Sequence, residues 1–155
     1  MERARAINRA VIATGWRARV ILLLAALLVL YYAADREPPF RLISTEPAEA
    51  QAGEYLTLRN KVHRDVSRGC NTEFTRYIFD SHGARYDMGH AQATAETIAR
   101  MERKTPGELL MSLRLPPNLA PGPATLQTVI HHECNRVHNV WPIRTTVDMP
   151  FTVLP

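Results

Sequence analysis

Hydrophobic and polar residues follow two different patterns along this chain. Residues Val20–Ala34 form an uninterrupted run of fifteen uncharged, mostly apolar residues that is rich in Leu. From residue 40 onwards, apolar and polar residues alternate over short stretches that are bounded by Gly, Pro and Asn. The first pattern predicts a membrane-spanning helix, and the second predicts a domain of β-strands.

The predicted membrane helix is short. Fifteen helical residues span about 22 Å, whereas the hydrocarbon core of a bilayer is about 30 Å thick. The anchor can extend down to residue 11, because Val11–Trp16 is mostly apolar and Arg17 and Arg19 can carry their charges to the interface. Trp16 and Tyr31-Tyr32 stand where aromatic belts occur at the two membrane surfaces.

The basic residues before this segment orient it. The leader, residues 1–19, carries five arginines against Glu2, whereas the far flank is Asp35-Arg36-Glu37. These membrane-orienting residues are Arg3, Arg5, Arg9, Arg17 and Arg19. Basic residues stay on the cytoplasmic side, so we expect a cytoplasmic N-terminus, a linker over residues 35–39 and an external domain over residues 40–155.

A cleaved secretory signal is the alternative, since it too has a basic leader and a short apolar core. Cleavage requires small residues at positions −1 and −3. A cut after Ala34 would place Tyr32 at −3, and a cut after Ala33 would place Tyr31 there. The sequence therefore favours an uncleaved anchor.

The segments that alternate predict an antiparallel sandwich of six to eight strands, spaced by about ten residues. Ser81-His82-Gly83 predicts a tight turn between two of them. His90–Arg103 has the composition of a short helix, although its alternation also fits a strand. The expected strand segments are Phe40–Ser44, Gly53–His63, Glu73–Asp80, Ala84–Met88, Gly107–Leu115, Ala124–Cys134 and one or two strands in Val140–Leu154.

Two cysteines, Cys70 and Cys134, are the only ones in the chain. In an oxidising compartment they predict a disulfide. The chain-entropy model gives about 4 kcal/mol of stability for closing a loop of about 65 residues. Two free thiols or a metal-binding pair are the alternatives.

The external segment resembles immunoglobulin-like bacterial envelope domains. The resemblance is carried by Pro121-Gly122, which feeds a long strand ending at Cys134, and by Cys70 about one sheet crossing upstream. It implies an immunoglobulin-like β-sandwich over residues 40–154. The chain departs from the immunoglobulin pattern because no Trp lies between the cysteines and His132 stands where a tyrosine corner would be.

Charge and composition narrow the classes of partner. The net charge is +4, of which residues 1–35 contribute +3 (five Arg, two acids) and the remainder +1 (14 basic, 13 acidic). The high isoelectric point therefore comes mainly from the arginines that orient the membrane helix, and we expect no nucleic-acid partner. Only 2 of the 19 basic residues are Lys, which is typical of a GC-rich bacterial genome, or of its phages or plasmids.

His131-His132-Glu133-Cys134, followed by His138, is the densest group of metal-ligand residue types. Neighbouring strand residues point to opposite faces, so only His132 and Cys134 share one. We expect no metal and no cofactor; the alternative site is His132, Cys134 and His138. The topology also resembles the copper-delivery assembly factors of respiratory oxidases, but their paired-cysteine motif is absent.

No catalytic motif is present. Ser67, His63 and Asp65 are within five residues of one another, whereas a catalytic triad is assembled from distant positions, and the chain has no GxSxG. We therefore expect a protein that is not an enzyme.

Aromatic and Arg residues on the strands suggest a binding surface. Tyr55 and Arg59 share one face of their strand, and Tyr77 and Phe79 share a face of the next one. Tyr and Arg are typical of binding hot spots, although an ordinary half-buried sheet would show the same pattern. Phe74, Arg76 and Ile78 occupy the opposite face from Tyr77.

Together these features predict a single-pass protein of the bacterial inner membrane with a periplasmic domain. Its partners would be the lipid bilayer and another envelope protein, and homo-oligomerisation is left open. We expect a non-enzymatic protein-binding or structural accessory subunit of an envelope, secretion, conjugation or phage-encoded assembly. The alternatives are copper or zinc delivery, and a phage or plasmid membrane protein for exclusion or lysis.

Overall fold

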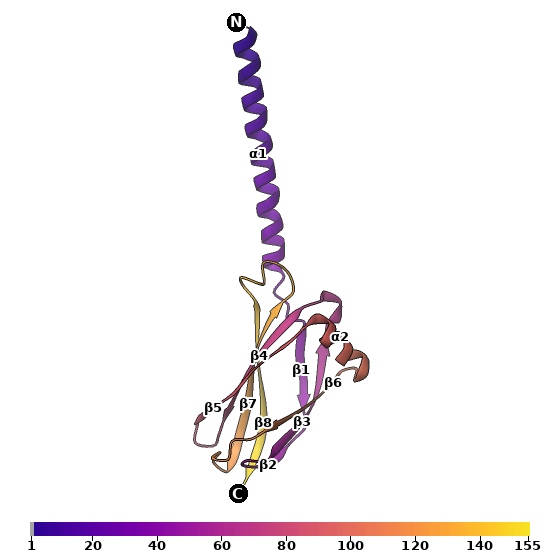
Figure 1. Ribbon diagram of the computed structural model, residues 1–155, viewed down its shortest axis with the longest axis vertical. Helices are drawn as coiled ribbons and strands as arrows, with labels where there is room; N and C mark the ends of the chain where they lie inside the picture. Colours follow the sequence, from indigo (N-terminus) through magenta and orange to yellow (C-terminus); the bar gives the residue numbers. More distant parts are fainter. Residues whose placement is uncertain (1) are drawn as a thin grey trace. The chain divides into compact units, whose positions relative to one another are not determined.

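The computed structural model describes residues 2–155, with side chains from Trp16 onwards. The chain divides into two compact units, residues 1–36 and 37–155. We describe each unit by itself (Figure 1).

The first unit is helix α1, which runs from Glu2 to Ala34. Its segment Trp16–Ala34 is 19 residues long, has a mean hydropathy of 1.8 and is long and apolar enough to cross a membrane. The apolar side chains of this segment are not covered by protein; Leu22, for example, is 69% exposed. The membrane prediction is thus supported by length and composition. The side chains of Arg3, Arg5 and Arg9 lie outside the described residues.

The second unit is mainly β, and in the described residues it forms two sheets. One has the strand order β1-β3-β6, and the other has the order β2-β8-β7-β4-β5. All neighbouring strands are antiparallel except β2 and β8, which are parallel. The strands are β1 (Phe40–Thr45), β2 (Glu49–Gln51), β3 (Tyr55–Arg64), β4 (Asn71–Phe79), β5 (Arg85–Ala93), β6 (Glu108–Arg114), β7 (Gly122–Glu133) and β8 (Ile143–Leu154).

Most predicted strands are confirmed, including the β4–β5 hairpin. Its turn closes with a hydrogen bond from the Asp80 amide to the Ala84 carbonyl (3.1 Å). The ambiguous segment from residue 90 to 103 divides: β5 continues to Ala93, and helix α2 (Ala95–Lys104) begins after the N-cap Thr94. The C-terminal segment is one strand rather than two, and the short β2 was not predicted.

The buried faces of both sheets share one hydrophobic core. Positions along β3 alternate strictly between exposed and buried, so Leu56 and Leu58 point inward and are fully buried. Ile78 of β4 and Leu126 of β7 are fully buried in the same cluster. The two sheets therefore face each other, and α2 lies beside β6 in Figure 1.

Cys70 and Cys134 form the predicted disulfide, with a sulfur–sulfur distance of 2.04 Å. Cys70 directly precedes β4 and Cys134 directly follows β7, and these two strands are neighbours in the five-stranded sheet, where Asn71 pairs with Glu133. The resemblance to immunoglobulin-like domains implied that the two cysteines lie on different sheets. This expectation is wrong, because the bridge joins the ends of two strands of the same sheet.

Candidate functional site: an internal cavity and an exposed sheet face

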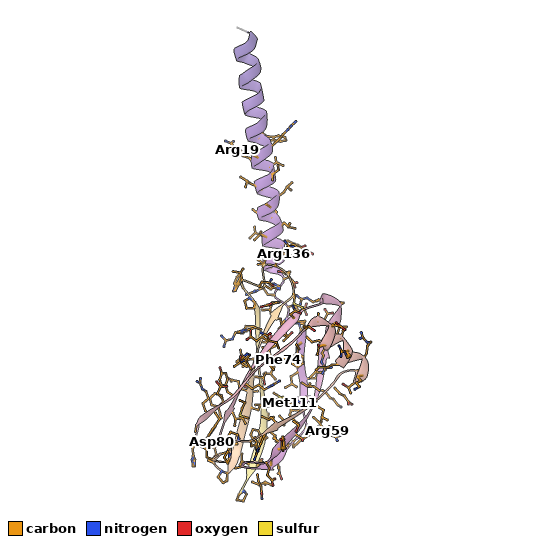
Figure 2. All side chains as sticks on the ribbon, in the orientation of Figure 1. Arg19, Arg59, Phe74, Asp80, Met111 and Arg136 are labelled. Carbon is orange, nitrogen blue, oxygen red and sulfur yellow. A yellow bond between two sulfur atoms is a disulfide. The ribbon has the colours of Figure 1, made fainter. Side chains whose placement is uncertain are left out.

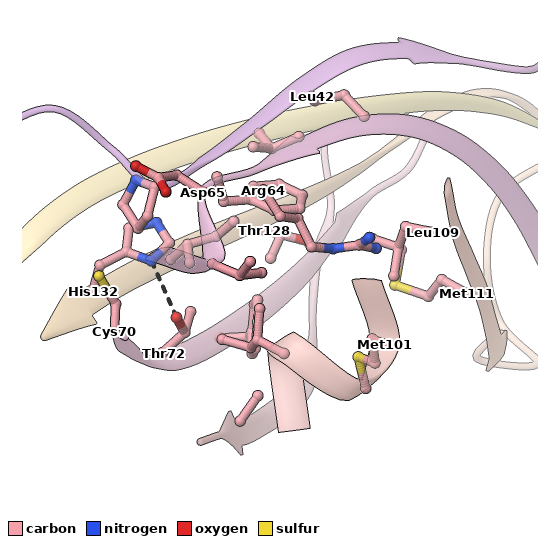
Figure 3. Close-up of a pocket in the computed structure, with 18 of the residues that line it drawn as sticks. Leu42, Arg64, Asp65, Cys70, Thr72, Met101, Leu109, Met111, Thr128 and His132 are labelled. Carbon is pink, nitrogen blue, oxygen red and sulfur yellow. Dashed lines mark hydrogen bonds between the residues drawn. The ribbon is translucent and has the colours of Figure 1, made fainter. Parts of the chain in front are cut away.

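A cavity of about 350 Å³ lies between the two sheets, at the end of the domain that carries the disulfide (Figure 3). Its wall comes from both sheets, from α2 and from the segment around the short 3-10 helix η1 (Val66–Arg68). Most lining side chains are apolar, among them Leu42, Phe74, Leu109, Met111 and Ile130. A volume of this size is within the range of small-molecule sites, which is about 300–1,000 Å³.

The inner face of β4 and β7 explains how polar groups reach this wall. Alternation turns every second residue of each strand inward, and the register places inward residues of the two strands opposite each other. Polar and apolar pairs then alternate along the face. In order from the disulfide, the pairs are Thr72–His132, Phe74–Ile130, Arg76–Thr128 and Ile78–Leu126. The first three pairs line the cavity.

His132 is almost completely buried, with 1% of its surface exposed. Its Nδ1 lies 3.1 Å from the Thr72 hydroxyl, the contact dashed in Figure 3, whereas its Nε2 has no hydrogen-bond partner. Burial is the main reason that the pKa of His132 falls to about 4, and electrostatic repulsion from Arg68 and His131 adds to this effect. The ring is therefore uncharged at neutral pH and offers a single neutral polar atom to the cavity.

Arg64 is a buried cation whose charge is balanced. It is 8% exposed; its Nη1 donates to Glu102 Oε2 of α2 at 2.6 Å, and its Nη2 donates to the Glu108 carbonyl at 2.7 Å. The other oxygen of Glu102 accepts from the Gly107 amide at 3.0 Å. Burial raises the pKa of Glu102, but these hydrogen bonds and the charge of Arg64 outweigh it, so the pKa lies below its usual value. The pair fixes α2 against β3 and β6.

Arg76 is a second cation in the cavity wall, and its charge is not balanced. It makes no hydrogen bond or ion pair with any described residue, and its buried Nε has no partner. Its guanidinium carbon lies 5.7 Å from the centroid of the Phe74 ring. Burial lowers the pKa of Arg76. The Thr128 hydroxyl opposite Arg76 is also buried without a partner.

Sequence reasoning missed this cavity, although one signal was present. The alternation of β4 places Arg76 on the same face as Phe74 and Ile78. An Arg between two apolar residues of one strand face is unusual for a buried face, because a buried charge normally needs a partner.

A second candidate site is the outer face of the three-stranded sheet. Tyr55 and Arg59 share one face of β3, as predicted, and both point outward. Leu110 of β6 pairs with Arg59. Tyr55 is 69% exposed, Leu110 is 66% exposed, and Ile43 of β1 is 68% exposed. Figure 2 labels Arg59 on this sheet. The face combines large apolar side chains with positive charge.

Tyr77 and Phe79 do not join that face. They lie on β4, which belongs to the five-stranded sheet and is not a neighbour of β3. Both are partly buried, and the Arg85 guanidinium lies over the Tyr77 ring, 4.8 Å from its centroid. The four predicted residues therefore form two separate pairs on opposite sheets.

The residues of the alternative metal site also have other partners. The Cys134 sulfur is in the disulfide, His132 contacts Thr72, and His138 Nε2 lies 3.4 Å from the Asn135 amide nitrogen. Among the described residues, no three His, Cys, Asp or Glu side chains lie close enough together to hold a metal ion. A disulfide sulfur is not a thiolate, so this trio lacks its soft ligand.

Ser67 and Asp65, which the sequence places near His63, have a structural role. The Asp65 carboxylate accepts from the Ser67 amide (3.1 Å) and hydroxyl (2.5 Å) and so caps η1. The hydrogen bond from the Ser67 hydroxyl lowers the pKa of Asp65. His63 points outward from β3.

No protein-family model matches this chain, and no curated protein matches it in sequence.

Proposed function

We propose that this protein is a membrane-tethered, non-enzymatic binding subunit that holds another envelope protein at the membrane surface. The N-terminus lies in the cytoplasm and the β domain in the periplasm of a bacterium. In support, the arginine-rich leader precedes a helix that can cross a membrane. The disulfide of the domain requires an oxidising compartment, which the periplasm supplies.

The observation that carries the proposal is the outer face of the three-stranded sheet, which we call the Tyr55 face. It displays Tyr55, Leu110 and Ile43, each about two-thirds exposed. Tyr55 pairs with Arg114, and Leu110 pairs with Arg59. Aromatic, aliphatic and Arg side chains are the residue types around which binding hot spots form. Its charged residues, Arg59, Lys61, Arg114 and Glu108, are mainly basic, which favours an acidic surface on the partner.

We also propose that the domain is an immunoglobulin-like sandwich. The strand order supports this: β1-β3-β6 corresponds to the order A-B-E, and β8-β7-β4-β5 corresponds to G-F-C-C′. The position of the disulfide differs from antibody domains, in which the bridge joins the two sheets. The fold supplies exposed sheet faces suited to binding.

The proposal is tested by crosslinking the full-length protein in native membranes and identifying co-purified proteins by mass spectrometry. We expect a stoichiometric envelope partner for the wild-type protein. Arg59→Glu reverses a charge on the Tyr55 face and should weaken recovery of the partner at least about tenfold. Arg144→Glu makes the same change at an exposed position of β8, on the other sheet, and should leave recovery unchanged.

A wild-type protein that is recovered alone would contradict the proposal. Equal loss of partner in both variants would show that the Tyr55 face is not the binding surface.

A further inference from the structure

The internal cavity carries a second proposal, independent of the protein partner. We propose that it binds an amphiphilic monocarboxylate: the carboxylate would pair with the Arg76 guanidinium, and the apolar body would lie between the sheets along Phe74 and Ile130. A medium-chain fatty acid has this chemistry.

The first argument is the unbalanced charge of Arg76. The same interior holds Arg64, and there the fold supplies both a carboxylate and a carbonyl to the guanidinium. Arg76 lines the cavity without any such partner among the described residues. A partly buried cation without a counter-charge is destabilising, and a bound carboxylate would relieve that cost through a charge-assisted, bidentate hydrogen bond.

The second argument is the hydroxyl beside it. Thr128 is directly opposite Arg76 across the β4–β7 ladder, which puts their Cβ atoms about 5 Å apart on the same face. Thr128 is 5% exposed, and its hydroxyl has no partner. It can donate a hydrogen bond to the second oxygen of a carboxylate held by Arg76. Both groups are therefore placed for one anionic head.

The third argument is the shape and polarity of the remaining wall. His132 follows Thr128 by four residues on β7, so the two are about 13 Å apart at 3.3 Å per residue, with the Phe74–Ile130 pair between them. The far end at His132 carries no charge at neutral pH. The two other charged residues of the wall are already partnered, Arg64 by Glu102 and Asp65 by Ser67. One unbalanced cation at one end therefore favours a ligand with a single charge at its terminus.

The volume sets the size of the ligand. A cavity of about 350 Å³ is at the lower end of the range of small-molecule sites, about 300–1,000 Å³, which favours a short ligand with a single chain. Decanoate, with ten carbons and two oxygens, is the probe we choose.

The test uses full-length protein in lipid nanodiscs and decanoate labelled with ¹³C at the carboxyl carbon. We expect a separate, saturable carboxyl resonance for bound decanoate that is absent with empty nanodiscs. Arg76→Gln and Thr128→Val should each weaken this binding, Arg76→Gln by at least about tenfold. Arg85→Gln removes an exposed arginine from the neighbouring strand β5 and should leave binding unchanged.

Decanol provides the matched ligand control, since it keeps the chain and lacks the charge. Competition by decanol as strong as that by unlabelled decanoate would overturn the proposal, and so would Arg76→Gln binding decanoate like the wild type. If Arg76→Gln does not fold, Arg76→Lys keeps the charge and loses the bidentate geometry. Binding by Arg76→Lys at wild-type strength, or no saturable binding by the wild type, would equally overturn it.

The carboxylate site and the Tyr55 face can fail separately. Arg76→Gln should leave partner recovery unchanged, and Arg59→Glu should leave decanoate binding unchanged.

Discussion

The two halves of the domain interior are built on the same strands but differ in what they enclose. Towards the β4–β5 turn, the sheets meet through Leu56, Leu58, Ile78 and Leu126, all with no exposed surface. Towards the disulfide, the same strands turn Arg64, Arg76, Thr128 and His132 inward around a cavity. We call these the packed half and the hollow half. Strand alternation decides which residues point inward, whereas residue type decides whether the interior closes.

The hollow half is held together by links that the packed half lacks. The disulfide joins β4 to β7 at this end, and the Arg64–Glu102 ion pair fixes α2 against it. These links replace part of the stabilisation that close apolar packing gives elsewhere.

The largest expected effect comes from removing the disulfide. Cys70→Ala with Cys134→Ala opens a loop between residues 64 positions apart and should lower the free energy of unfolding by about 4 kcal/mol. Denaturant unfolding measures the loss. Hydrogen exchange should rise most around His132 and least around Leu126; a uniform rise would show that the two halves are one cooperative unit.

The packed half is tested by cavity creation. Leu126→Ala should lower the free energy of unfolding by about 3 kcal/mol, because surrounding side chains cannot close the new void. Met111→Ala, at the wall of the existing cavity, should lower it by only about 1 kcal/mol. Chemical denaturation of both variants gives the comparison, and equal losses would contradict the distinction between the halves.

The hollow half should make stability depend on pH through His132. Its pKa is about 4 in the folded state and about 6.5 when unfolded, so the unfolded state binds more protons between these values. Stability is therefore fully present above pH 6.5 and falls as the pH drops towards 4. We expect a loss of about 2 kcal/mol between pH 7 and pH 5.

Denaturant unfolding at a series of pH values checks this dependence. In His132→Gln, the loss of stability between pH 7 and pH 5 should be absent. In His90→Gln, at an exposed position of β5, this loss should remain. A pH profile that His132→Gln leaves unchanged would show that another group is responsible.

The smallest expected effect concerns the helix that covers the hollow half. Glu102→Gln removes the counter-charge of Arg64 and should lower the free energy of unfolding by about 1 kcal/mol, since a glutamine oxygen can still accept a hydrogen bond. Amide exchange in Ala95–Lys104 should rise. Glu96→Gln breaks only an exposed pair with Arg100 and should change neither quantity.

Particular residues show how far the sequence could predict this protein. The alternation in β4 correctly placed Tyr77 on the opposite face from Phe74 and Arg76. It could not show which of the two faces is buried, because that depends on the sheet packed against β4. The cysteine pair was predictable because the chain has no other cysteines, yet its place within one sheet depends on strand order. Strand β2 was not predicted because three residues are too few to show a recognisable alternation of apolar and polar positions. It forms a strand through its pairing with β8.

The candidate sites were predictable only in part. Tyr55 and Arg59 share a face because they lie on one strand, so alternation was sufficient. Tyr77 lies on β4, the next long strand after the one that carries Tyr55 and Arg59. The segment that contains η1 connects the two sheets, so Tyr77 and Tyr55 lie on different sheets. The cavity depends on how two sheets and α2 meet, which no local pattern encodes.

The position of the disulfide also has a mechanical consequence. The linker enters the domain at β1, an edge strand of the three-stranded sheet, whereas the bridge lies in the other sheet. A pulling force between the membrane anchor and a protein held on the Tyr55 face would run through the β1–β3 ladder and bypass the covalent bridge. Under such tension we expect β1 to separate from β3 before the bridged strands β4 and β7 separate from each other.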